Sequence, residues 1–283
     1  MKVLCNGCSY TWRTNERFRQ DKIRWPEILA NKLPQHEFTN LAHLGAGNFY
    51  IKESTIDYIK NNDVDHVLIM WSGFSRYDVS VTQEQYDILN TGKKYRCKSS
   101  RDLWVSSGDM LKPLWVSSGG NSGAWKNWGY YDPAINDIIA DCFEEYYKNI
   151  NWLQHYADSL QQIIDVQQYC KLNNVPYTFM NYRNHLNKSH ADVQKEKFNI
   201  DIADQFSFGL NAEPYMCDFE QLDNIVNQID FDNWCFIDNN KNGIWELALT
   251  FPGRTGTYDD GDHPGTNTAE LFVTQYLLPT LNW

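Results

Sequence analysis

The chain has 283 residues, enough for one large domain that buries its core without disulfides. Its formal net charge is -11 at pH 7 and its cationic residues are dispersed, which argues against a nucleic-acid partner because phosphate-backbone binding needs clustered cations. No apolar run approaches the roughly 20 residues that cross a bilayer, so we expect neither a transmembrane segment nor membrane insertion.

The predicted elements alternate between short apolar runs of strand length and amphipathic stretches with helical spacing. In chain order they are a strand at 2–5, a helix at 25–33, a strand at 37–41, a helix at 49–60, a strand at 67–71, a helical region at 132–172, a strand at 175–180, helical pieces within 192–228, a strand at 234–237 and a helix at 268–278. The continuous apolar run VLIMW at 67–71 is typical of a parallel strand covered on both faces. The alternation predicts an α/β protein.

Residues 78–132 interrupt this pattern with a stretch rich in Gly, Ser and Trp. A short repeat lies within it, because Leu103-Trp-Val-Ser-Ser-Gly108 recurs as Leu114-Trp-Val-Ser-Ser-Gly119. Two copies predict paired strands or matching turns, and are too few for a solenoid. We expect a single domain over 1–283 with 78–132 as an insertion on the edge of the sheet or over its active face.

The cysteines and the first residues bear on where the protein works. Seven scattered cysteines, an odd number, are not typical of a small scaffold held together by disulfides, and they favour a reducing compartment over an oxidising one. The opening residues MKVLCNG hold too short an apolar run for a signal peptide, so a cytoplasmic protein is expected. Aromatic residues make up 15% of the chain, and exposed Trp and Tyr stack on sugar rings, which keeps a carbohydrate substrate open.

Ser9 follows the first predicted strand in the segment Asn6-Gly7-Cys8-Ser9-Tyr10-Thr11. A serine hydroxyl becomes a nucleophile when a base removes its proton, and a sharp turn after a strand presents both its oxygen and its backbone N–H to a bound carbonyl. Gly7 permits such a turn. Alone, the segment is more typical of an ordinary loop serine.

The base is predicted near the other end, in Asp259-Asp260-Gly261-Asp262-His263-Pro264. An Asp three residues before a His can accept a hydrogen bond from imidazole Nδ1 and leave Nε2 facing a nucleophile. Asp260 has that spacing from His263, whereas Asp262 is adjacent to the His and would point elsewhere. The alternative without a catalytic role is an acidic surface turn that happens to contain a His.

Together these segments resemble the SGNH/GDSL hydrolase family. Gly7-Cys8-Ser9 is similar to the family's Gly-Asp-Ser, with Cys8 in place of Asp. The run from Asn40 to Gly45 is similar to its second block, whose glycine N–H joins that of the serine as an oxyanion donor, and Asp260 to His263 is similar to its last block. The resemblance implies a flavodoxin-like fold, a three-layer α/β/α sandwich around a central parallel sheet, with ester or acyl hydrolysis and no metal or organic cofactor.

The third block departs from the family, which places Gly-x-Asn-Asp after the third strand and uses the Asn as an oxyanion donor. This chain reads Trp71-Ser-Gly-Phe-Ser-Arg76 there and has no Asn. Loss of one such donor typically lowers turnover about 100- to 1000-fold. The residues that could replace it are Ser72 and Asn48, which we assign to the oxyanion hole beside Ser9 and Gly45, and also Ser75 and Arg76.

Two further motifs are candidates for binding sites. Cys5-Asn-Gly-Cys8 could be a redox pair or half of a zinc site, but no second pair follows at ligand spacing. The segment Asp238 to Gly243 imitates the start of a calcium loop, yet its twelfth position is Leu249 where a Glu is required. A hairpin turn between Ile237 and Ile244 is the favoured interpretation.

The sequence therefore predicts a serine esterase that forms an acyl-enzyme on Ser9 and acts on a small-molecule or glycan ester, such as an acetylated carbohydrate. The rival is a non-catalytic SGNH-fold protein with a structural or glycan-binding role. Trp71-Ser-x-x-x-Arg76 and His263-Pro264 also resemble uncharacterised SGNH-like proteins carried by tailed bacteriophages. The resemblance to phage proteins implies a place in the virion, with virion proteins or further copies of the chain as partners.

Overall fold

The computed structural model describes residues 1–12, 23–43, 46–74, 76–81, 114–117, 149–187, 216–251, 263–281 and 283. Among these residues, no helix combines the length and apolarity that crossing a membrane requires.

Five parallel strands form the central sheet. They are β1 (Lys2–Gly7), β2 (Glu37–Asn40), β3 (His66–Trp71), β6 (Tyr177–Asn181) and β7 (Trp234–Cys235). Their order across the sheet is β2-β1-β3-β6-β7, and every neighbouring pair is parallel. Counted along the chain this is the 2-1-3-4-5 order of flavodoxin-like folds. The predicted α/β class with a parallel sheet is confirmed.

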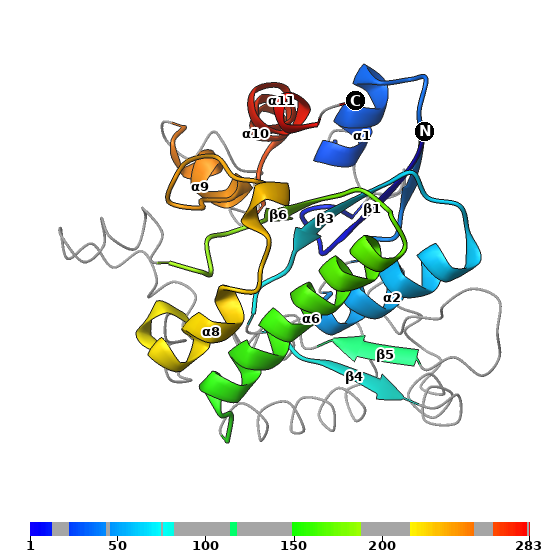
Figure 1. Cartoon of the computed structure of the whole chain (residues 1–283). Coiled ribbons are helices and arrows are strands. Elements are labelled where there is room, and N and C mark those ends of the chain that lie inside the picture. The colour runs from blue at the N-terminus through cyan, green and yellow to red at the C-terminus, as the bar shows by residue number, and fades with distance from the viewer. Residues whose placement is uncertain are drawn as a thin grey trace, which may run out of the picture.

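The helices lie on both faces of this sheet (Figure 1). On one face are α1 (Trp25–Lys32), α10 (Thr266–Phe272) and α11 (Leu278–Thr280), the last two joined by the π-helical turn η6 (Val273–Leu277). On the other face α2 (Asn48–Asn61) packs against α6 (Trp152–Leu172). All five residues from Val67 to Trp71 are 0% exposed, as expected for a strand covered from both sides.

Shorter elements connect the main ones. They are η2 (Met216–Asp218), η3 (Glu220–Leu222), α8 (Asp223–Val226), η4 (Phe231–Asn233) and α9 (Ile244–Leu249). The predicted helical pieces within 192–228 correspond in their described part to η2, η3 and α8. The first part of the helical region predicted at 132–172 lies outside the described residues, and α6 begins where Asn151 accepts a hydrogen bond from the Gln154 amide.

A second, two-stranded sheet lies apart from the central one. Strands β4 (Asp78–Val81) and β5 (Leu114–Ser117) pair antiparallel, and β4 lies next to the start of α2. The Asp78 carboxylate accepts hydrogen bonds from the Gly47 and Tyr50 amides, both at 2.9 Å, and so caps the amino end of α2. The second copy of the repeat thus supplies β5, while the first copy and most of the predicted insertion 78–132 lie outside the described residues.

Two local predictions were wrong. The first strand does not end at Cys5, because β1 continues to Gly7, which pairs with Met70 of β3. The predicted hairpin after Ile237 is instead a turn from β7 into α9. Gly243 is the N-cap residue of α9, and its amide donates to the Glu246 carboxylate at 2.8 Å. That Gly-x-x-Glu spacing is a helix-start signal that outweighs the Asn-Gly pair.

Candidate active site

Ser9 lies on a tight turn that directly follows β1. The amides of Thr11 and Trp12 both donate to the Cys8 carbonyl oxygen at 2.9 Å, which closes the turn around Ser9. Gly7 has a φ of +154°, and a Cβ atom there would meet the Thr11 side chain and lie 2.7 Å from the Met70 carbonyl oxygen. The close approach of β1 to β3 therefore requires a glycine before the turn.

Asn6 anchors the end of β1 to helix α2. Its Nδ2 donates to the Ile51 carbonyl oxygen, Ser54 Oγ and Thr55 Oγ1 at 3.2, 2.8 and 2.9 Å, and its Oδ1 accepts from the Gly7 amide at 2.8 Å. The side chain is 0% exposed. A fully satisfied buried amide of this kind fixes backbone position, so it holds the residues that lead into Ser9.

His263 meets Ser9 from the far end of the chain. Ser9 Oγ and His263 Nε2 are 2.9 Å apart, although 254 positions separate the two residues. When Nδ1 carries the ring proton, the serine hydroxyl donates this hydrogen bond and Nε2 is placed to take its proton. Ser9 is 5% exposed, whereas His263 is half-buried.

Aromatic rings and a buried arginine surround His263. The Tyr10 ring centroid lies 5.0 Å from that of His263 and 4.4 Å from that of Tyr182, which comes from the loop after β6. Arg24, just before α1, is 5% exposed and donates from Nη1 to the Pro264 carbonyl oxygen at 3.3 Å. The residue after His263 is therefore tied to the helix that follows the Ser9 turn.

The segment resembling the second family block runs alongside the Ser9 turn. Asn40 Nδ2 donates to the Thr11 carbonyl oxygen at 2.8 Å, and the His43 amide donates to the Gly7 carbonyl oxygen at 3.1 Å. These bonds hold residues 40–43 against the turn on its β2 side. Gly45, the predicted oxyanion donor, lies outside the described residues.

The segment after β3 holds the residues that stand in place of the third block. Ser72 Oγ donates to the Ala46 carbonyl oxygen at 2.6 Å, and the Ser72 amide donates to Asn48 Oδ1 at 2.8 Å. Phe74 is 1% exposed and stacks on His185 with ring centroids 5.2 Å apart, so it belongs to the core. Ser75 lies outside the described residues.

Of the catalytic residues predicted from the sequence, the structure brings Ser9 and His263 together. Asp260, the predicted partner of His263, lies outside the described residues. Sequence reasoning missed Arg24, and it placed Asn6 only in the segment that follows the first strand. Neither residue carries a local motif for its role, because their partners lie 240 and 45 to 49 positions away.

The two alternative motifs form no site of their own among the described residues. Cys5 and Cys8 are buried free thiols, and burial, with a smaller contribution from Glu27, raises the pKa of Cys5 well above its usual range. Its thiolate, the form that reacts or binds metal, is therefore disfavoured. Asp238 accepts hydrogen bonds from the Asn240 and Asn242 amides in a turn, and no group of three metal-binding side chains occurs in the described part of the chain.

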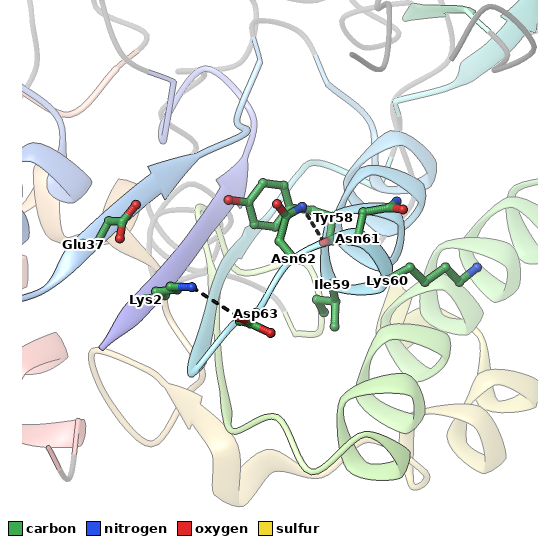
Figure 2. A pocket seen from close by; sticks show the side chains of 8 residues that line it. All are labelled: Lys2, Glu37, Tyr58, Ile59, Lys60, Asn61, Asn62 and Asp63. Atoms are coloured by element: carbon green, nitrogen blue, oxygen red, sulfur yellow. Dashed lines mark hydrogen bonds and ion pairs between the residues drawn. The ribbon is translucent and has the colours of Figure 1, made fainter. Parts of the chain in front are cut away.

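A groove of about 550 Å³ lies where β1 and β2 begin, at the end of the sheet away from Ser9 (Figure 2). It is lined by Lys2, Glu37, Tyr58, Ile59, Lys60, Asn61, Asn62 and Asp63. Lys2 and Glu37 begin β1 and β2, whereas Ser9 follows the carboxyl end of β1. Ligands of parallel α/β sheets bind at the carboxyl ends, beside the strand at which the order reverses, and Ser9 has that position.

Comparison with known proteins finds a distant structural likeness. No protein-family model matches the chain, and no curated protein matches it. The chain is similar to a solved structure described as a "putative GDSL-like lipase" from Parabacteroides merdae, with 13% sequence identity, a TM-score of 0.41, and coverage of 95% of this chain and 90% of that one. A likeness this distant carries no inference about activity, so the site rests on its own geometry.

Proposed function

We propose that the chain is a serine hydrolase of the SGNH/GDSL type that cleaves carboxylic esters through an acyl-enzyme on Ser9. The observation that carries the proposal is the 2.9 Å contact between Ser9 Oγ and His263 Nε2. A nucleophile and its base within hydrogen-bond reach are the geometric requirement for this chemistry. The position of Ser9 after β1 of a flavodoxin-like sheet supports the same assignment.

In the proposed reaction, His263 Nε2 takes the hydroxyl proton as Ser9 Oγ bonds to the ester carbonyl carbon. The carbonyl π electrons move onto its oxygen and form a tetrahedral oxyanion. When the bond to the alcohol oxygen breaks, His263 returns the proton to that oxygen, and the acyl group stays on Ser9. Water then repeats the sequence, with His263 again taking and returning a proton, and releases the carboxylic acid and free Ser9.

Further roles in this proposal follow the family resemblance. Asp260 would accept from His263 Nδ1 and fix the ring tautomer, and the Ser9 and Gly45 amides would donate to the oxyanion. The hydrogen bonds that close the Ser9 turn use the Thr11 and Trp12 amides and leave the Ser9 N–H outside that network among the described residues. This arrangement supports Ser9 as a backbone donor.

The proposed substrate is a small-molecule or glycan ester, with an acetylated carbohydrate as the leading class. The aromatic share of the chain, 15%, supports this choice, because sugar rings stack on aromatic faces. Near His263 the half-buried Tyr182 ring, which packs on Tyr10, is the candidate for such a contact. The cytoplasm and, for a bacteriophage component, the virion are the proposed locations.

The test is turnover of 4-nitrophenyl acetate and of an acetylated oligosaccharide by the wild type and by Ser9→Ala, His263→Gln and His36→Gln. Loss of turnover in the first two variants, with retention in His36→Gln at the opposite edge of the sheet, supports the proposal. Unchanged turnover in folded Ser9→Ala would rule it out. A folded wild type that binds the oligosaccharide without cleaving it would favour the structural or glycan-binding role instead.

A further inference from the structure

The family's third oxyanion donor is an asparagine side chain that this chain lacks, so another group must serve if the hole is complete. Such a donor has to lie beside the nucleophile turn, carry an uncommitted N–H or O–H, and be reachable by a substrate oxygen. Arg76, in the segment after β3, is the described side chain that best meets these three conditions.

Arg76 lies between the two segments that carry the backbone donors. Its Nη1 donates to the Ala46 carbonyl oxygen at 3.1 Å, next to Gly45 in sequence. Its guanidinium also interacts with the Cys8 thiol, next to Ser9 in sequence. Arg76 therefore contacts the residues that lie next to both predicted donors in sequence.

The rings beside His263 hold the other side of the guanidinium. Arg76 Cζ lies 6.0 Å from the centroid of the Tyr182 ring, which packs on Tyr10, and Tyr10 packs on His263. The Tyr182 hydroxyl lies against Gly73, so this ring reaches across the end of β3. The arginine is thereby oriented by contacts on more than one side, as a preorganised donor requires.

Ser72 and Asn48 are less suited to this role in their present geometry. The Ser72 hydroxyl already donates to the Ala46 carbonyl oxygen at 2.6 Å. Asn48 Nδ2 lies in a side chain that is 2% exposed, and the nitrogen itself is sealed from solvent, so a substrate oxygen cannot reach it. Arg76 is half-buried, and a guanidinium has five N–H donors, of which the bond to the Ala46 carbonyl oxygen uses one and the hydrogen bond with Cys8 another.

We propose that Arg76 is a catalytic residue that donates a charge-assisted hydrogen bond to the oxyanion formed on Ser9, in place of the missing asparagine. The proposal rests on the proposed function. A cation offers more than an amide at this position, because a hydrogen bond with an ionised donor is about twice as strong as a neutral one.

The protonation state of Arg76 suits this role. Burial alone would lower its pKa, but interactions with Cys8, Tyr182 and Tyr10 outweigh burial, and the pKa lies above its ordinary value. Burial, together with Arg183 and Arg76, holds the pKa of the neighbouring His185 well below its usual range. The Arg76 guanidinium therefore remains charged.

The test compares kcat and KM for 4-nitrophenyl acetate in the wild type, Arg76→Ala and Arg76→Met. Loss of a transition-state donor should lower kcat about 100- to 1000-fold with little change in KM. Arg76→Met keeps the length that packs on Tyr182 and serves if Arg76→Ala fails to fold. Guanidinium chloride at millimolar, non-denaturing concentration should partly restore kcat in Arg76→Ala, which a merely structural role would not produce.

Arg183→Ala is the matched control, because it removes a guanidinium from the loop after β6. It should keep most of its activity and show no guanidinium rescue. Wild-type kcat in folded Arg76→Ala or Arg76→Met overturns the Arg76 proposal alone. A wild type without Ser9-dependent turnover overturns the proposed function, and the Arg76 proposal with it.

Discussion

Arg24 Nη1 donates to the carbonyl oxygen of Pro264 at 3.3 Å, across 240 positions of sequence. The bond is buried, and it links the start of α1 to the residue that follows His263. Trp25, the first residue of α1, also donates from its indole N–H to Thr11 Oγ1 in the Ser9 turn at 3.1 Å. The start of α1 is therefore bonded to the segments that carry both Ser9 and His263. Arg24 is thus a positioning residue for His263.

Arg24→Met should lower kcat for ester hydrolysis roughly 10- to 100-fold with a smaller change in KM, because a displacement of about 1 Å in a reacting group can cost 100-fold. Arg24→Lys should recover part of this loss by restoring a cationic donor. Lys32→Ala is the control on the same helix, since it breaks only the surface ion pair with Glu270 of 2.6 Å. Equal kcat in Arg24→Met and the wild type would contradict the role.

Gly7→Ala should destabilise the protein. A Cβ atom at this position would lie 2.7 Å from the Met70 carbonyl oxygen, and the φ of +154° disfavours an L side chain. We expect the free energy of unfolding to fall by roughly 1–3 kcal/mol in denaturant titrations, the range for overpacking. Gly73→Ala is the matched control, because its Cβ atom would lie 3.0 Å from the Tyr182 hydroxyl rather than from backbone. A smaller loss at Gly7 than at Gly73 would refute this account.

Asn6→Asp keeps the shape of the side chain but removes the donor that faces the Ile51 carbonyl oxygen and the two α2 hydroxyls. At neutral pH it buries a carboxylate against a carbonyl oxygen, which should lower the free energy of unfolding by about 2 kcal/mol or more. The loss should shrink in acid, where a protonated carboxyl can donate. Asn224→Asp, at an exposed position of α8, should have little effect at either pH. Equal losses at Asn6 and Asn224 would show that Asn6 is no anchor.

Much of the fold follows from the sequence because its strands are coded locally. The run VLIMW can be satisfied only where helices cover both faces, and the structure buries it completely. Ser9 and His263 were predicted because each sits in a short motif with a chemical meaning. Arg24 and Asn6 act through partners far along the chain, and no local pattern encodes such contacts.

The turn after β7 shows where a local rule misleads. Asn242-Gly243 favours a hairpin, but a hairpin also needs a second strand to receive it. The structure instead uses Gly243 to start α9, with the Glu246 carboxylate accepting from the Gly243 amide at 2.8 Å and from the Asn184 amide at 3.2 Å. Glu246 is consequently buried at 6% exposure.

Glu246 should make stability fall as the pH rises from about 4.5 to about 7. Burial raises its pKa in the folded protein to about 7, partly offset by hydrogen bonds from Gly243 and Asn184 and by Arg183. Between about pH 4.5 and about pH 7, Glu246 is protonated in the folded state and ionised in the unfolded state. Each rise in pH within this window therefore lowers the free energy of unfolding, and the loss is complete above the folded pKa. Glu246 should lower the free energy of unfolding by roughly 3 kcal/mol across this pH window.

Glu246→Gln should flatten this dependence in urea titrations performed at pH 5 and pH 8. The exposed Glu220→Gln variant is the control and should retain the wild-type difference between the two pH values. His66, whose pKa burial lowers to about 4, acts in the opposite direction but contributes equally to the wild type and both variants. An identical pH difference in Glu246→Gln and the wild type would contradict the assignment.

The central claim is that Ser9 is a nucleophile activated by His263. The most direct measurement is intact-mass analysis of the folded protein after reaction with a fluorophosphonate, followed by peptide mapping. We predict a single adduct on Ser9 in the wild type, no adduct in Ser9→Ala, and much slower labelling in His263→Gln. A folded wild type that stays unlabelled, or His263→Gln labelled at the wild-type rate, would contradict the claim.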